Sequence, residues 1–318
     1  MCATDLCQKS LVIRLEERYS AEMKTSHFSR MLIIFLTMIS MNSTNCPADD
    51  SQTMAVINDP RIDESSGLAI SRNHPRCVWI HNDSGAKPVL YLVGYDGETK
   101  AVVKVLKADA IDWEDMCSFE INGQAWLLIA DVGDNDKKRS AKKHVCKLYL
   151  MKEPKVPQAN GLPTISWPVV STISFEYEDG SHNCESVAVD TQLMEILLLT
   201  KAKPQKSGLY RLPLKLDEPN QSLTAQRFAS PFVPYATGMD VSPDNSTLAI
   251  CTLLNGLIVK RTPNQSWQEA CSGTPIPMML PPRRQGETIC FESDNKHLLL
   301  NSEKTKQPLY RIPVPETK

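Results

Sequence analysis

The chain repeats one pattern five times, and this repetition constrains its fold more than any other feature. Each copy begins with a polar or acidic residue that is followed by an alternating apolar stretch. The copies lie at 66–71, 114–119, 185–190, 237–242 and 287–292. They begin 48, 71, 52 and 50 residues apart, a period that is typical of stacked or radially arranged supersecondary units.

Two further apolar runs follow each copy. The first set lies at 78–81, 126–130, 196–200, 248–251 and 298–301. The second set lies at 90–93, 148–151, 209–212, 257–260 and 309–312, and four of its five members begin Leu-Tyr. Short apolar runs bounded by turn residues predict buried strands.

A fourth, more polar strand is predicted at 101–106, 170–177, 224–229 and 268–271. Polar character is expected of an outer edge strand, because that strand must resist pairing with other chains. The fifth copy lacks such a strand, since few residues remain after Ile312. The unassigned run at 53–57 can supply it from the other end of the chain and so close a ring.

These patterns predict an all-β chain: a β-propeller of four-stranded blades, closed by an N-terminal strand. Five blades fit best. Six remain an alternative if the 71-residue interval contains a degenerate blade, but its extra residues fall in polar 133–146 and Pro-rich 153–168, which are typical of loops. An α/β fold is disfavoured because no amphipathic segment of helix length follows residue 50.

Composition narrows the class of protein. The 318 residues are 42% hydrophobic and 23% charged, as in ordinary globular proteins. Basic and acidic side chains number 35 and 37, so the formal net charge is only −2. Without a positive field, nucleic acid is excluded as a partner.

The N-terminal residues have the order of a secretory signal. An apolar run at 31–41 follows Lys24, His27 and Arg30 and precedes polar 42–45. We expect a 1–45 extension with its apolar core at 31–41, a single propeller domain at 46–318, and export from the cytoplasm with no transmembrane span in the mature chain. A short buried helix is the alternative. Lipidation at Cys46 is not expected, because the residues before it do not resemble a lipidation signal.

Ten cysteines and no C-x-x-C pair argue against a disulfide framework, a zinc ribbon and a redox motif. We expect the cysteines of the repeat region to be small buried residues.

Carboxylates recur at equivalent positions of the repeats. If the first strand of each blade lines a central channel, five of them converge on one mouth: Glu64, Asp112, Glu114, Glu185 and Glu287. Closely spaced carboxylates need a cation, basic neighbours or raised pKa values. Hard oxygen ligands favour Ca²⁺ or Mg²⁺ over zinc. Candidate catalytic residues in this mouth are Glu114, Glu185, Glu287 and Asp112.

More acidic residues follow the second strands, in Asn82-Asp83-Ser84-Gly85 and in 131–135. Asx-Gly clusters are also ordinary turn chemistry. Antiparallel pairing nevertheless places the end of the second strand beside the start of the first. The predicted metal ligands, with Ca²⁺ as the preferred ion, are therefore Asp112, Glu114, Asp131, Asp134 and Glu185.

Further side chains are predicted to contact a ligand at the mouth: Glu64, Asp83, Lys201, His81 and Tyr235. Lys201 occupies the repeat position of Asn82-Asp83, so it should reach the carboxylates or an anion. His81 could be a ligand or a proton shuttle, but a lone histidine is more often a hydrogen-bonded structural residue. The chain contains no G-x-S-x-G, Gly-rich phosphate loop or H-E-x-x-H, so the sequence does not support hydrolase triads, P-loop nucleotide binding or zincin chemistry.

Seven short strings resemble a family of bacterial β-propeller proteins, many of them secreted. They lie at 64–68, 79–85, 112–115, 131–135, 185–186, 237–244 and 285–287, and the match spans about residues 55–313. The resemblance implies the fold rather than an activity. The chain departs from the pattern at Cys117, Cys184 and Cys290, where small residues are usual. A looser similarity to propeller phytases and five-bladed glycosidases rests on architecture and acidity, and fold does not imply function.

Three functions remain open from the sequence. The first is a monomeric binding module whose acidic mouth holds a metal ion and a small-molecule or protein ligand. The second is a hydrolase, either a glycosidase that uses two mouth carboxyls or a phosphoesterase that uses calcium-held water. The third is a purely structural scaffold.

Overall fold

Strands make up nearly all of the regular structure, as the alternating apolar patterns predict. The computed structural model describes residues 52–136, 139, 145–157, 160–253 and 255–316. The predicted signal segment at 31–41, the 1–45 extension and Cys46 lie outside the described residues. The described chain is all-β, which confirms the predicted class.

The first repeat forms an antiparallel sheet in chain order. Its strands are β2 (Ser65–Ile70), β3 (Cys77–Asn82), β4 (Val89–Gly94) and β5 (Thr99–Leu106). A fifth strand, β9 (Thr164–Pro168), pairs in parallel with β5. Part of the Pro-rich segment predicted as a loop is therefore a strand. The indole Nε1–H of Trp167 in this strand donates a hydrogen bond to Lys152 O at 2.8 Å.

The second and third repeats merge into one eight-stranded sheet. One half consists of β6 (Trp113–Ile121), β7 (Gln124–Asp131), β8 (Cys146–Lys152) and β10 (Ser171–Tyr177). The other half consists of β11 (Cys184–Asp190), β12 (Glu195–Thr200), β13 (Leu209–Pro213) and β14 (Asn220–Ala229). The two outer strands β10 and β14 pair in parallel and join the halves.

The last two repeats form separate four-stranded sheets. The fourth contains β15 (Ala236–Val241), β16 (Thr247–Thr252), β17 (Gly256–Lys260) and β18 (Ile276–Met278). The fifth contains β19 (Cys290–Phe291), β20 (His297–Leu300), β21 (Pro308–Pro313) and β1 (Gln52–Val56). Strand β1 pairs antiparallel with β21, so the prediction that the run at 53–57 completes the last repeat is confirmed.

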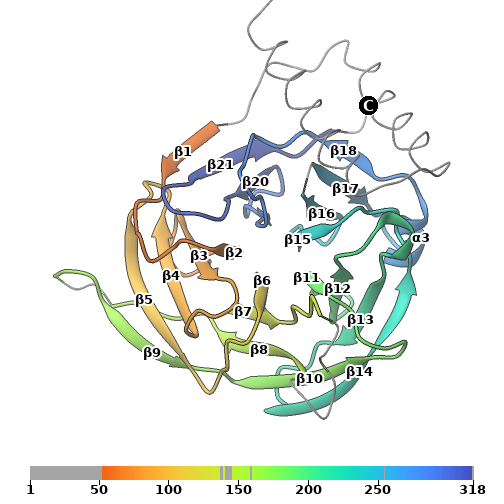
Figure 1. Ribbon diagram of the computed structural model, residues 1–318, viewed down its shortest axis with the longest axis horizontal. Coiled ribbons are helices and arrows are strands. Elements are labelled where there is room, and N and C mark those ends of the chain that lie inside the picture. The colour runs from red at the N-terminus through yellow and green to blue at the C-terminus, as the bar shows by residue number, and fades with distance from the viewer. Residues whose placement is uncertain (1–51, 137–138, 140–144, 158–159, 254, 317–318) are drawn as a thin grey trace, which may run out of the picture. The chain divides into compact units, whose positions relative to one another are not determined.

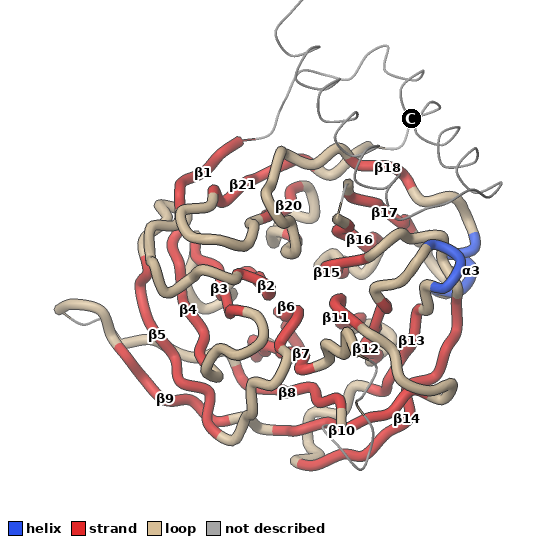
Figure 2. Tube along the Cα trace, viewed as in Figure 1, coloured by secondary structure: helices blue, strands red, loops and turns tan. Residues whose placement is uncertain are grey.

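The predicted strand at 268–271 is wrong, because this segment forms helix α3 (Trp267–Ser272), seen near β14 in Figure 2. Ser266 and Glu269 make a reciprocal capping box. Trp267, Ala270 and Cys271 are buried at helical spacing. The outer strand of this sheet is β18 instead; η1 (Pro204–Lys206) is a single 3₁₀ turn.

The inner strands β2, β6, β11, β15 and β19 are neighbours in that order, and β19 also contacts β2. Figure 1 shows β2, β6, β11 and β15 toward the centre of the ring of strands, with β5, β9, β10 and β14 at its periphery. Five apolar clusters fill the spaces between successive repeats, and one of them joins the fifth repeat to the first. Each repeat therefore buries apolar side chains against the repeats on both sides of it.

Four of the inner strands are irregular at the same repeat position. The pairing register shifts between Ser65 and Gly67 in β2 and between Trp113 and Asp115 in β6. It shifts likewise in β11 and β15. A β-bulge bends a strand and turns a side chain out of the regular alternation. The shifted segments contain Ser66, Glu114, Glu185 and Thr237.

Asp115 follows the bulge of β6 and links three inner strands. Its fully buried carboxylate accepts hydrogen bonds from Met116 N at 2.8 Å, Val187 N at 2.8 Å and Met239 N at 3.2 Å. The equivalent positions of the other repeats carry small residues, Gly67, Ser186, Gly238 and Thr288. Small side chains there leave room for one carboxylate among the strands.

Asp240 has a similar role between the fourth and fifth repeats. Its buried carboxylate accepts from Val241 N at 2.9 Å and from Phe291 N at 2.8 Å. Burial raises the pKa of Asp240 to about 7, although these two N–H donors and the charge of Arg72 oppose the shift.

The seven cysteines of the described region are free, and six of them are buried, while Cys77 is half-buried. The prediction that they are small buried residues is confirmed for those six. No helix of the described residues is both long enough and apolar enough to cross a lipid bilayer.

Replacing Asp115 by Ala should lower the free energy of unfolding by about 2–6 kcal/mol, because the N–H groups of Val187 and Met239 would lose their acceptor. Asp115→Asn keeps one acceptor oxygen and should cost less. Chemical denaturation measures both, with exposed Asp96→Ala as the control. An Asp115→Ala variant as stable as the control would contradict the linking role.

The raised pKa of Asp240 predicts a pH dependence of folding. A carboxyl that binds its proton more tightly when folded contributes stability below its ordinary pKa near 3.8, and this contribution is lost as pH rises through about 7. The stability difference between the wild type and Asp240→Asn should therefore fall between pH 4 and 7, by at most about 1.4 kcal/mol per pH unit. Denaturation of both proteins across this range measures it, and a difference that grows with pH would refute the assignment.

Candidate functional site

Six carboxylates gather where the inner strands begin and the second strands end. Glu114 and Glu185 come from the bulges of β6 and β11, Asp112 and Glu287 precede β6 and β19, and Asp83 and Glu303 follow β3 and β20. We call this group the carboxylate cluster: Asp83, Asp112, Glu114, Glu185, Glu287 and Glu303.

The cluster contains two overlapping groups of three. Carboxylate oxygens of Asp83, Asp112 and Glu114 lie within 4.8 Å of one another. Oxygens of Asp83, Glu287 and Glu303 also lie within 4.8 Å of one another. Asp83 is common to both groups.

Glu114 is the most unusual member, because its side chain is 3% exposed and unpaired. Within the described parts of the chain, no hydrogen bond or ion pair engages its carboxylate. Its backbone is held by Ser66, whose hydroxyl donates to Glu114 O at 2.5 Å. The strand is therefore anchored, while the carboxylate lies within 4.8 Å of oxygens of Asp83 and Asp112.

Gly133 makes room for this arrangement. A Cβ atom at this position would collide with Glu114 Oε1 and Asp112 Oδ2. The N–H groups of Val132 and Gly133 both donate to Asp112 O, at 3.1 and 3.2 Å, and hold the loop against the start of β6. Glycine is needed here for close approach rather than for an unusual φ.

Glu185 differs from Glu114 because it has a cationic partner. Lys201 Nζ forms an ion pair with Glu185 Oε2 and lies 4.0 Å from Glu287 Oε1. Asn183 Nδ2 donates to Glu185 Oε1 at 3.1 Å. The prediction that Lys201 reaches the carboxylates agrees with this geometry.

Glu287 and Glu303 are joined by an amide. Gln285 Nε2 lies 3.2 Å from Glu287 Oε1 and 2.7 Å from Glu303 Oε1. Lys304 Nζ pairs with Glu303 Oε2 at 3.1 Å. This half of the cluster is partly neutralised, unlike the half around Glu114.

Burial and mutual repulsion raise the pKa values of the cluster. Burial, followed by the charges of Glu185 and Asp83, raises the pKa of Glu114 well above its ordinary value. Burial raises the pKa of Asp83 to about 6, and burial with a hydrogen bond to Glu303 raises the pKa of Glu287 to about 8. In the absence of a cation, protons neutralise part of the cluster near pH 7.

Two predicted metal ligands, Asp131 and Asp134, lie beside the cluster with partners of their own. Asp131 is fully buried and pairs with Arg139 Nη2 at 2.7 Å, while it accepts from Asp112 N at 3.0 Å. Asp134 accepts from Arg139 N at 3.1 Å. Neither residue belongs to a group of ligand atoms within 4.8 Å. Asp131 therefore positions Asp112.

Three predicted ligand-binding residues are also outside the cluster. His81 is fully buried with its ring against Trp113, and Nδ1 lies 3.0 Å from Asn82 O. Burial lowers the pKa of His81 to about 4, so this residue is a neutral structural histidine. Tyr235 has a left-handed backbone (φ 50°) and its N–H donates to Ala202 O at 2.9 Å. Glu64 is exposed.

Glu64 does line a cavity of about 430 Å³. Asn82, Ser84 and Gly85 also line this cavity, and they are sequence neighbours of Asp83 in the turn after β3. Tyr91 and Lys87 form part of the remaining wall. None of the six cluster residues lines this cavity, so its link to the cluster is the turn that carries Asp83.

The sequence interpretation missed Glu303 and Arg139. A signal for Glu303 existed, because it follows the second strand of the fifth repeat, as Asp83 and Lys201 do in the first and third. Arg139 offered none, since it lies in a polar segment without periodicity.

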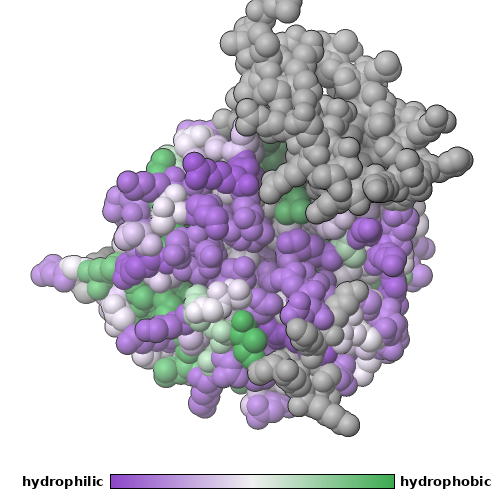
Figure 3. Space-filling view, viewed as in Figure 1, coloured by the Kyte–Doolittle hydropathy of each residue, from purple (hydrophilic) through white to green (hydrophobic). Residues whose placement is uncertain are grey.

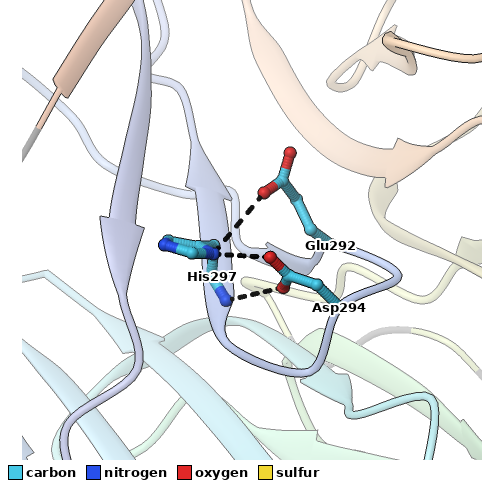
Figure 4. Close-up of side chains that lie close together, drawn as sticks. All are labelled: Glu292, Asp294 and His297. Carbon is cyan, nitrogen blue, oxygen red and sulfur yellow. Dashed lines mark hydrogen bonds and ion pairs between the residues drawn. The ribbon is translucent and has the colours of Figure 1, made fainter.

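A third acidic group lies apart from the cluster and contains Glu292, Asp294 and His297 (Figure 4). His297 Nδ1 is 2.6 Å from Asp294 Oδ2 and 4.0 Å from Glu292 Oε2. Arg311 already pairs with both carboxylates, at 2.7 and 3.4 Å. These side chains are explained by their own ion pairs.

Hydrophilic side chains cover most of the face shown in Figure 3.

No protein-family model matches the chain, and no curated protein matches it. The resemblance to bacterial propeller proteins therefore stays a prediction.

Replacing Lys201 by Met should destabilise the cation-free protein by about 3–5 kcal/mol, because Glu185 would remain buried without its ammonium partner. The double variant Glu185→Gln with Lys201→Met should recover most of this loss. Denaturation in the presence of chelator measures all three free energies. If Lys201→Met is as stable as wild type, the ion pair between Lys201 and Glu185 does not contribute to the free energy of unfolding.

Proposed function

We propose that the chain is an exported five-bladed β-propeller whose carboxylate cluster binds a divalent cation, with Ca²⁺ preferred. The closed order of inner strands supports the five blades, and so does the apolar cluster between the fifth and first repeats. Pairing of β1 with β21 supplies the closing strand. In this interpretation, the eight-stranded sheet is two blades joined at their outer edges.

The observation that carries the cation proposal is the unpaired Glu114 carboxylate. A buried charge without a partner is costly, so it must be neutralised by a proton or by a ligand. Asp83 and Asp112 place their oxygens within 4.8 Å of it, a suitable spacing for one ion. Gly133 keeps this space free of a side chain.

The donor set favours a hard cation. All six members of the carboxylate cluster offer oxygen, and Ca²⁺ accepts six to eight oxygen ligands in flexible geometry. Magnesium requires a near-ideal octahedron, and zinc prefers nitrogen and sulfur donors. The imidazole of His81, the histidine predicted to lie at the mouth, is buried against Trp113.

A bound cation would serve as a bridge between the protein and a ligand. The cavity of about 430 Å³ is lined by Asn82 and Ser84, the sequence neighbours of Asp83, and offers space for such a ligand. A binding module is thus the function that the site supports best. Hydrolysis of a phosphoester would require the same cation first, so the phosphoesterase alternative depends on the same test.

Ca²⁺ should raise the melting temperature of the full-length chain. Binding to the folded state adds about 2.7 kcal/mol of stability at a hundredfold excess over Kd. Glu114→Gln should lose at least half of this rise, because it removes a charged ligand at full volume. Differential scanning calorimetry with Ca²⁺, with Mg²⁺ and with chelator measures the effect.

The matched control is Glu120→Gln, since Glu120 is an exposed residue of the same strand. It should retain the full calcium effect. In chelator, Glu114→Gln should melt no lower than wild type, because it relieves repulsion. A calcium effect that persists undiminished in Glu114→Gln would disprove the site.

A further inference from the structure

We infer that the carboxylate cluster is a two-cation centre in which Asp83 bridges two divalent ions. This inference rests on the proposed function and specifies how many ions the same site binds. One ion would lie among Asp83, Asp112 and Glu114, and the other among Asp83, Glu287 and Glu303.

The formal charge of the fully ionised cluster matches two divalent ions better than one. Among the described residues, the six carboxylates face two ammonium groups, those of Lys201 and Lys304. This leaves four formal negative charges when all groups are ionised. One divalent ion would compensate half of them, whereas two ions would compensate them all.

The cations already present are distributed unevenly. Lys201 pairs with Glu185 and Lys304 pairs with Glu303. Neither ammonium group pairs with Asp83, Asp112 or Glu114. The unpaired and buried Glu114 carboxylate therefore marks the first ion position, independently of the acidic count.

Asp83 has the geometry of a bridging ligand. It is the shared member of both groups, and among the described residues its carboxylate accepts one hydrogen bond, from the N–H of Ser84 in its own turn, at 2.5 Å. Two oxygens of one carboxylate can each bind a different ion. In known two-metal sites the ions lie about 3.5–4 Å apart, which is compatible with two such groups sharing a residue.

The second ion position uses ligands that are already aligned. Gln285 Nε2 contacts both Glu287 and Glu303, which orients their carboxylates toward one another. Both side chains are buried, at 4% exposure. An ion there would replace the hydrogen bond that now joins the two carboxyl groups.

The number of bound ions determines which reactions the site could support. A single calcium ion suffices for a structural or bridging role, whereas paired ions are the arrangement that stabilises both attacking and leaving oxygens in displacement at phosphorus. The count therefore discriminates between the binding module and the phosphoesterase alternative more directly than affinity does.

The test is the number of ions bound by the full-length chain. Equilibrium dialysis against Ca²⁺ followed by elemental analysis should give two ions per wild-type chain. Glu114→Gln and Glu303→Gln should each retain about one, because each removes a ligand of one group only. Glu292→Gln is the matched control and should retain two, since Glu292 belongs to the group neutralised by Arg311.

A second measurement tests the bridge and keeps the inference falsifiable if a variant folds poorly. With Mn²⁺ as the probe, the electron paramagnetic resonance spectrum of the wild type should show spin coupling between two ions, and Asp83→Asn should abolish it. One ion per wild-type chain, or two uncoupled ions, would overturn the two-cation centre and leave the proposed function intact. No bound ion would overturn both.

Discussion

The carboxylate of Asp115 is the contact on which the centre of the molecule depends. It accepts backbone hydrogen bonds from its own strand and from two other inner strands, at Val187 and Met239. A fully buried acceptor shared by three strands fixes their relative register. It also fixes the bulge that precedes it in β6, and this bulge directs Glu114 away from the regular pleat. The structural carboxylate and the unpaired one are therefore adjacent residues with opposite roles.

The distinction between these two carboxylates organises the candidate site. Asp115, Asp131 and Asp240 each have donors for their oxygens, so their burial is explained by the fold. Glu114 has none within the described residues, and its neighbours Asp83 and Asp112 raise the cost of its charge. The fold anchors this strand through Ser66. The buried Glu114 carboxylate then needs a proton or a cation to neutralise it.

Much of this arrangement followed from the repeats, because equivalent positions of a repeated strand occupy equivalent places. The inner strands, the closing strand β1 and the convergence of Glu114, Glu185 and Glu287 could be predicted in this way. Pairwise contacts could not. The ion pair between Asp131, a predicted metal ligand, and Arg139 is one such contact. The segment at 268–271 is helical because Ser266 and Glu269 cap it, a local signal that the repeat pattern concealed.

The central claim is that the carboxylate cluster binds a divalent cation through Glu114. Isothermal titration calorimetry of the chelator-treated full-length chain with Ca²⁺ tests it most directly. The account predicts saturable binding by the wild type and an affinity at least about tenfold weaker in Glu114→Gln, a loss of about 1.4 kcal/mol. Absence of binding, or equal affinity in the two proteins, would contradict it.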